Sequence, residues 1–170
     1  APTEPSLPER ATATTGRCRG AQYRSLDPLI GHWQTKSSGR EGGGSPPAVR
    51  ADAEVVGILD GCSVEQRLRI STPVLPRAEI YVVLAWDAGA ESWVAYSISS
   101  TDGTMERWTG TVKGRELDLK RTEPDGALHR WRWSWSSDGT AASIERARHD
   151  RGGGWTQVFS LSLARVSPPQ

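Results

Sequence analysis

The sequence lacks Asn altogether and has a single Phe, a single Met and only three Lys among its 170 residues. Without Asn there is no acceptor site for N-linked glycosylation. Arg outnumbers Lys in a way that the codon usage of a GC-rich genome explains, so the Arg content does not indicate nucleic-acid binding. The 21 basic residues are balanced by 20 acidic ones, and the formal charge of +1 gives no general attraction to phosphate. We therefore expect no nucleic-acid partner.

Long apolar runs are also missing. No stretch approaches the roughly 20 apolar residues that a membrane-spanning helix needs, so we expect no membrane span. The length suits one domain. We expect an extended N-terminal arm over residues 1–20, a domain over residues 21–167, a short helix within residues 20–28 and a polar loop over residues 37–47.

Cysteine is limited to Cys18 and Cys62. In an oxidising compartment these two form a natural disulfide pair, whereas in the cytosol they would be two reduced core thiols. The first residues, Ala1-Pro2-Thr3, do not include Met, as expected of a mature N-terminus left by signal-peptide cleavage, although a trimmed chain would look the same. We expect a periplasmic or secreted protein that is a monomer or a dimer.

Turn signals recur at regular intervals in the second half of the chain. Four dipeptides lie 11, 12 and 13 residues apart: Asp102-Gly103, Lys113-Gly114, Asp125-Gly126 and Asp138-Gly139. Gly at such positions supplies the positive φ of a tight hairpin turn, and the spacing is typical of consecutive antiparallel strands. We expect about ten strands, over residues 30–37, 48–58, 63–71, 78–87, 91–99, 104–112, 115–121, 127–136, 140–149 and 154–166.

A meander of ten strands exposes two edges unless it closes on itself. We therefore predict an all-β fold, a single antiparallel up-and-down β-barrel of about ten strands with a short N-terminal helix. A two-layer sandwich is the alternative. Barrels of eight to ten strands have an interior that side chains fill or that holds one small ligand.

Apolar and polar residues alternate along the expected strands, which predicts that one face of each is buried. One such face carries the only Phe beside other apolar residues: Trp155, Phe159, Leu161 and Leu163. Another carries three indoles and an imidazole: His129, Trp131, Trp133 and Trp135. The opposite face would carry a basic cross-strand cluster if the two strands concerned pair with each other. This cluster would consist of Arg130, Arg132, Arg146 and Arg148.

Several short motifs occur in an order that is similar to a known family. Leu29-Ile30-Gly31-His32-Trp33 resembles the Gly-x-Trp signature that opens the first strand of lipocalins and related calycin barrels. Together with Cys18, the segment Leu59-Asp60-Gly61-Cys62 and Arg165, it resembles exported bacterial lipocalin-like proteins of unknown function with paired cysteines. The resemblance implies a calycin barrel whose base is closed by Arg165 packing across the Trp33 ring.

Related ten-stranded barrels of the nitrobindin type bind haem through a His on the last strand. The corresponding segment here, Thr156-Gln157-Val158-Phe159-Ser160, contains no His, so we expect no haem and no other cofactor. The three histidines, His32, His129 and His149, also lack the spacing of metal ligands, and we expect no metal.

The Trp-rich face is the strongest candidate for a functional site. It predicts either large rings that fill the barrel or an aromatic wall that binds a small apolar or aromatic ligand. The expected wall consists of Trp93, Tyr96, Trp108, Trp131, Trp133 and Trp135. Glu106 and His129 are candidate polar groups that orient the ligand.

Two other functions use the same interior differently. An isomerase, cyclase or hydrolase would use His129 and a carboxylate such as Glu106 as an acid–base pair. A structural or assembly protein would have a barrel collapsed around its own side chains.

Overall fold

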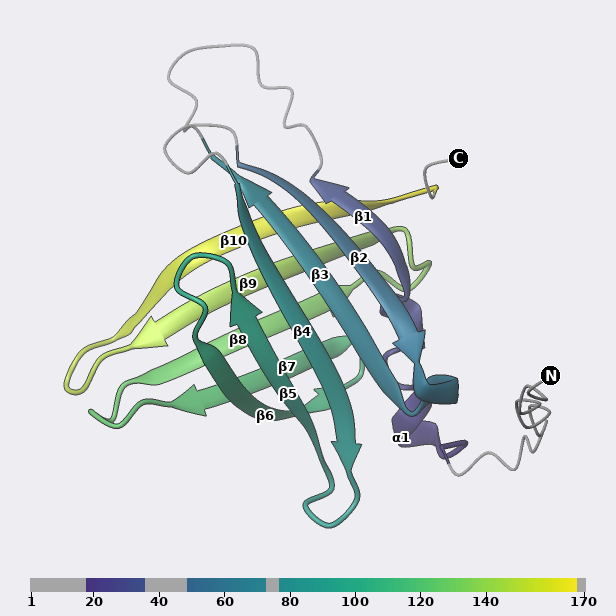
Figure 1. The fold of residues 1–170 in the computed structure, drawn as a ribbon, viewed down its shortest axis with the longest axis horizontal. Helices are drawn as coiled ribbons and strands as arrows, with labels where there is room; N and C mark the ends of the chain where they lie inside the picture. The colour runs from purple at the N-terminus through teal and green to yellow at the C-terminus, as the bar shows by residue number, and fades with distance from the viewer. Residues whose placement is uncertain (1–17, 36–48, 73–76, 168–170) are drawn as a thin grey trace, which may run out of the picture.

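The computed structural model of the protein describes residues 18–35, 49–72 and 77–167. Most of the expected N-terminal arm and the whole expected loop over residues 37–47 lie outside the described residues. The described part is all-β, as predicted, apart from three short helical segments (Figure 1). These are α1 (Ala21–Arg24), η1 (Asp27–Leu29) and η2 (Leu59–Gly61). None of the helices in this part of the chain is long and apolar enough to cross a membrane.

Ten antiparallel strands close into one barrel, which confirms the predicted fold. They are β1 (Gly31–Thr35), β2 (Arg50–Ile58), β3 (Ser63–Ser71), β4 (Ala78–Asp87), β5 (Ser92–Ser99), β6 (Met105–Lys113), β7 (Glu116–Thr122), β8 (Leu128–Trp135), β9 (Ala141–His149) and β10 (Trp155–Val166). Each strand pairs with the next, and β10 pairs with β1 to complete the ring. Full closure leaves no edge strand unpaired.

Tight turns join the later strands where the Gly-containing dipeptides were found. Gly103 and Gly126 have φ of 68° and 87°, values that residues other than Gly rarely adopt. The Asp125 carboxylate accepts a hydrogen bond from the Ala127 amide at 2.9 Å, which stabilises its turn locally.

One end of the barrel, here called the base, carries all three short helical segments. Cys18, next to α1, forms a disulfide with Cys62, which follows η2, so the chain before the first strand is fixed to the β2–β3 connection. The turns joining β4 to β5, β6 to β7 and β8 to β9 lie at this end as well. The opposite end carries the turns β5–β6, β7–β8 and β9–β10.

Arg165 also acts at the base, as the resemblance implied. Its guanidinium carbon lies 4.4 Å from the centre of the Trp33 ring. The same guanidinium donates hydrogen bonds of 2.6 Å to the carbonyl oxygens of Pro28, Ile30 and Gly139. One side chain of the last strand therefore holds the start of β1 and the β8–β9 turn together.

The barrel interior is filled from every strand by alternate residues. The largest buried side chains are five indoles, each at most 1% exposed: Trp33, Trp93, Trp108, Trp131 and Trp133. They belong to a single hydrophobic core that also includes Leu68, Leu117 and Ile144. The alternation seen in the sequence therefore gives the inward face of β8 correctly.

A β-bulge in β10 makes one predicted face wrong. Gln157 pairs with Ala147 of β9, but Phe159 pairs with the next residue, Arg146, so Val158 is an extra residue in β10. The extra residue reverses the alternation. Trp155 consequently lies outside, 44% exposed, and not on the inner face of Phe159.

Candidate binding site in the barrel interior

Trp108 of β6 and Trp131 of β8 meet edge to face inside the barrel. Their ring centroids are 5.7 Å apart, with 75° between the ring planes. Two cations also lie over the Trp108 ring, with the guanidinium carbons of Arg121 and Arg146 at 5.2 and 5.3 Å from its centre. The ring of Trp108 therefore separates the apolar interior from a charged layer near the end opposite the base.

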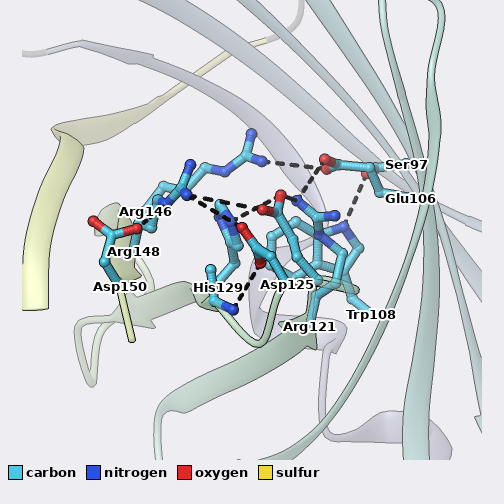
Figure 2. A network of polar contacts seen from close by, with 11 residues as sticks. Ser97, Glu106, Trp108, Arg121, Asp125, His129, Arg146, Arg148 and Asp150 are labelled. Atoms are coloured by element: carbon cyan, nitrogen blue, oxygen red, sulfur yellow. Dashed lines mark hydrogen bonds and ion pairs between the residues drawn. The ribbon is translucent and has the colours of Figure 1, made fainter. Parts of the chain in front are cut away.

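Glu106 lies at the centre of this charged layer (Figure 2). Its Oε1 is 2.8 Å from Nη2 of Arg121, and its Oε2 accepts a hydrogen bond of 3.2 Å from Arg146. Glu106 is thus on the inner face, where its carboxylate joins β7 to β9 through the two arginines. Both carboxylate oxygens of Glu106 are therefore engaged by guanidinium groups.

His129 lies beside this layer and is only 6% exposed. Its Nε2 is 3.1 Å from Oε1 of Glu123, the same oxygen that accepts a hydrogen bond of 3.0 Å from Arg121. Burial lowers the pKa of His129 below its ordinary value of 6.5, and the charge of Arg121 lowers it further while Glu123 opposes the shift. His129 is therefore neutral at neutral pH.

The innermost charges balance one another. Arg121 and Arg146 face Glu106 and Glu123, two cations against two anions. Burial lowers the pKa of the Arg146 guanidinium from its ordinary value, while Glu106 opposes that shift. This layer therefore carries no net charge that would attract an ion of either sign.

Arg148 extends the network toward solvent. Its Nε donates a hydrogen bond of 2.7 Å to Asp150, and its Nη2 lies 4.0 Å from carboxylate oxygens of Glu123 and Asp125. The hydrogen bond to Asp150 raises the pKa of Arg148. Figure 2 shows these groups running from the interior to the β7–β8 and β9–β10 turns.

Two of the expected wall residues lie at the base and not beside Trp108. Trp93 donates its indole N–H to Oγ of Ser25, just after α1, at 3.3 Å. Trp135 lines an open hollow of about 440 Å³ together with Arg24, Arg115 and Asp138. A second hollow of about 430 Å³ lies beside Arg165 at the same end. Neither hollow is lined by Trp108, Trp131 or Trp133.

Tyr96 lies on the outer face, and the expectation that it lines the interior is wrong. It is 47% exposed, whereas its neighbours Ala95 and Ser97 are buried on the inner face of β5. Ser97 accepts the indole N–H of Trp108 at 3.0 Å, so β5 contributes a small polar group to the interior where Tyr96 was expected.

The expected basic cross-strand cluster is also wrong. Arg130 pairs in register with Ala147 and Arg132 with Glu145, so these two arginines share the outer face with alternate residues of β9. Arg146 and Arg148 lie on the inner face instead, within the network around Glu106. The four arginines therefore do not form one surface.

Sequence reasoning did not identify Arg121 and Glu123 as part of this site, and it assigned Arg146 and Arg148 to the opposite face. Arg121 could have been placed inside, because it continues the odd-numbered inner face of Leu117 and Leu119. Its partner Glu123 is only two residues away, but its contact with Glu106 depends on how β6 and β7 align. Among the described residues, no group of three or more His, Cys, Asp or Glu is arranged to hold a metal ion.

No protein-family model matches this chain, and no curated protein matches it significantly.

Proposed function

We propose that this protein is a lipocalin-like binding module whose barrel interior takes one small apolar or aromatic molecule. The observation that carries the proposal is the set of buried indoles facing the axis beside a charge-balanced layer, namely Trp108, Trp131 and Trp133 near Glu106, Arg121 and Arg146. Aromatic walls with a few placed polar groups are typical of small-molecule sites.

The charged layer supports this function by its position. It lies at the end opposite the disulfide and Arg165, and the side chains of Glu106, Arg121 and Arg146 are 18–22% exposed there. In this proposal the base is the fixed end and the charged layer is the entrance.

We also propose export as the setting of this function. The Cys18–Cys62 disulfide supports a periplasmic or secreted location, because such bonds persist in oxidising compartments. The closed ten-stranded barrel and the Trp33–Arg165 contact support the likeness to calycins. The barrel domain is taken as residues 21–167.

The test is a titration of the full chain with a panel of neutral aromatic probes, followed by intrinsic Trp fluorescence and by native mass spectrometry. We expect a saturable change with one probe molecule per chain. The Trp131→Phe variant should alter this response, whereas Trp155→Phe, which makes the same change on the outer surface, should retain it. A chain that binds no probe in either measurement would support the structural, side-chain-filled barrel instead.

An enzyme is the second candidate, and the contact between His129 and Glu123 favours it. A neutral imidazole 3.1 Å from a carboxylate is a competent acid–base pair, although the partner is Glu123 and not the Glu106 expected from sequence. Glu106 instead contacts Arg121 and Arg146. A molecule that co-purifies with the protein decides between the two functions. If the protein is an enzyme, this molecule should be chemically altered after incubation with the wild type and unaltered after incubation with His129→Gln. If the protein is a carrier, the molecule should be unaltered after incubation with either.

A further inference from the structure

Indole N–H groups distinguish two of the five Trp residues that are at most 1% exposed from the other three. Trp33 donates to the Leu29 carbonyl at 2.8 Å, and Trp93 and Trp108 donate to serine hydroxyls. The Nε1 atoms of Trp131 and Trp133, each on a side chain only 1% exposed, have no acceptor among the described residues. A buried donor without a partner is costly, so it is rare without a reason.

The two unpartnered donors belong to one face of one strand. Trp131 and Trp133 are two residues apart on β8 and both point inward, so their Cα atoms are about 7 Å apart along the strand. A third unpartnered donor, Nε2 of Gln66, lies on β3, which is five strands from β8 in either direction around the ring. Gln66 is 4% exposed and lies between the inward-facing Val55 and Val82.

The surroundings of these donors suit an acceptor carried by an apolar body better than they suit water. Trp133 pairs with Leu117 and Ile144, both buried apolar residues, whereas Trp131 pairs with Leu119 and Arg146. A buried water needs two to four polar partners, which the neighbours of Trp133 do not supply. An oxygen atom attached to a ring would satisfy an indole N–H while the ring contacts the apolar side chains.

Charge excludes an ionised ligand at this position. The cation beside Trp131 in the register is Arg146, which is already bound to Glu106, and the innermost layer is balanced at two cations and two anions. A carboxylate or ammonium group would lose its hydration without gaining a counter-charge, which disfavours its binding.

We propose that the ligand of the barrel interior is a neutral planar molecule bearing a carbonyl oxygen, which accepts hydrogen bonds from the indole N–H groups of Trp131 and Trp133. This inference rests on the proposed function and narrows it. Hydrocarbons and ionised acids are disfavoured as ligands, and Gln66 supplies a further donor from the facing wall.

Matched probes that differ only at the acceptor test this inference. Indane and 1-indanone form the smaller pair, and fluorene and 9-fluorenone the larger pair, with fluorene-9-carboxylate as the charged member. Calorimetric titration should show the ketone of at least one pair binding roughly tenfold more tightly than its hydrocarbon, because each hydrogen bond contributes on the order of 1 kcal/mol. The carboxylate should bind more weakly than the ketone.

Spectra of the wild-type protein give a second readout that needs no variant to fold. In a ¹H–¹⁵N spectrum assigned by triple-resonance methods, the indole N–H signals of Trp131 and Trp133 should move downfield with the ketone and not with the hydrocarbon. The signal of Trp33, which already has an acceptor, should stay in place. In Trp131→Phe and Trp133→Phe the preference for the ketone should decrease, while Trp155→Phe retains it.

The outcomes separate this inference from the proposed function. Equal affinity for ketone and hydrocarbon, or tighter binding of the carboxylate, overturns the acceptor site and leaves a binding module intact. Indole signals that do not respond to a bound ketone also overturn it, because the donors would then be satisfied by buried water or left unpaired. Absence of binding by every probe overturns the inference and the proposed function together.

Discussion

Arg165 of the last strand covers the ring of Trp33 in the first strand, with its guanidinium carbon 4.4 Å from the ring centre. The two residues are direct partners in the β1–β10 register that closes the barrel. Because Arg165 also donates to three carbonyl oxygens, it joins β10 to the segment before β1 and to the β8–β9 turn. Arg165 therefore contributes both to the closure of the sheet and to the anchoring of its base.

Replacing Arg165 tests that role. We expect Arg165→Ala to lower the free energy of unfolding by about 1–3 kcal/mol, because it removes charge-assisted hydrogen bonds and a cation–π contact at a solvent-exposed site. Arg165→Lys should restore only part of the loss, since an ammonium group does not reproduce the planar three-way geometry. Urea denaturation measures both. Arg151→Ala, at an exposed turn position, is the matched control, and an equal loss in that variant would contradict the assignment.

The disulfide should stabilise the same end of the barrel. Cys18 and Cys62 are 44 residues apart, and removing a bridge that closes such a loop commonly costs about 2–4 kcal/mol. The double variant Cys18→Ser/Cys62→Ser should melt at a lower temperature than the wild type. Dithiothreitol should lower the melting temperature of the wild type toward that of the double variant and leave the double variant unchanged. Equal melting temperatures of the two proteins without reductant would contradict this.

Acidification should destabilise the fold through His129. Its pKa in the folded protein is below the ordinary 6.5, so the unfolded chain binds a proton at a higher pH than the folded one. The free energy of unfolding should therefore fall as the pH decreases below about 6.5 and stop falling, for this group, below the folded pKa. His129→Gln should lose less stability than the wild type between pH 7.5 and pH 5.5 in chemical denaturation. If the two proteins lose the same amount, His129 is not the group responsible.

Gly110 should tolerate no side chain. It lies on β6 opposite Leu119, and a Cβ atom at this position would collide with the backbone of Asp118 and Leu119 on β7. We expect Gly110→Ala to destabilise the protein by about 1–3 kcal/mol, as overpacking in a rigid interior does. Gly154→Ala, where an added Cβ meets nothing within 4 Å, is the matched control. Thermal denaturation should separate the two variants clearly, and equal melting temperatures would exclude the clash.

Local pattern was enough for the strands and for the inner face of β8. Trp131 and Trp133 alternate with arginines, and turn dipeptides lie at the ends of the strand regions. The apolar–polar alternation and the turn positions therefore predict the same strand. The same rule, applied strictly, excludes Tyr96. It is three residues from the inward-facing Trp93, and positions an odd number apart lie on opposite faces of a regular strand.

Two other features required the structure because they are not local. The extra residue at Val158 has no sequence signal of its own, yet it turns Trp155 outward, where the Arg130 guanidinium lies 4.6 Å from the Trp155 ring centre. The contact of Glu106 with Arg146 spans 40 residues and exists only because β6 to β9 align in one register. The alignment of these four strands determines which charged side chains pair with one another, and no short sequence motif predicts that alignment.

The asymmetry between the two ends of the barrel has a mechanical consequence. A covalent bridge and a multidentate arginine restrain the base, whereas the other rim is held by side chains that exchange partners easily, such as Arg148 with its three carboxylate neighbours. Breathing motions of the cylinder should therefore be graded along its axis, smallest near Trp33 and largest near Arg148. In native-state hydrogen exchange, the amides of β8 should lose protection progressively from Trp135 toward Leu128.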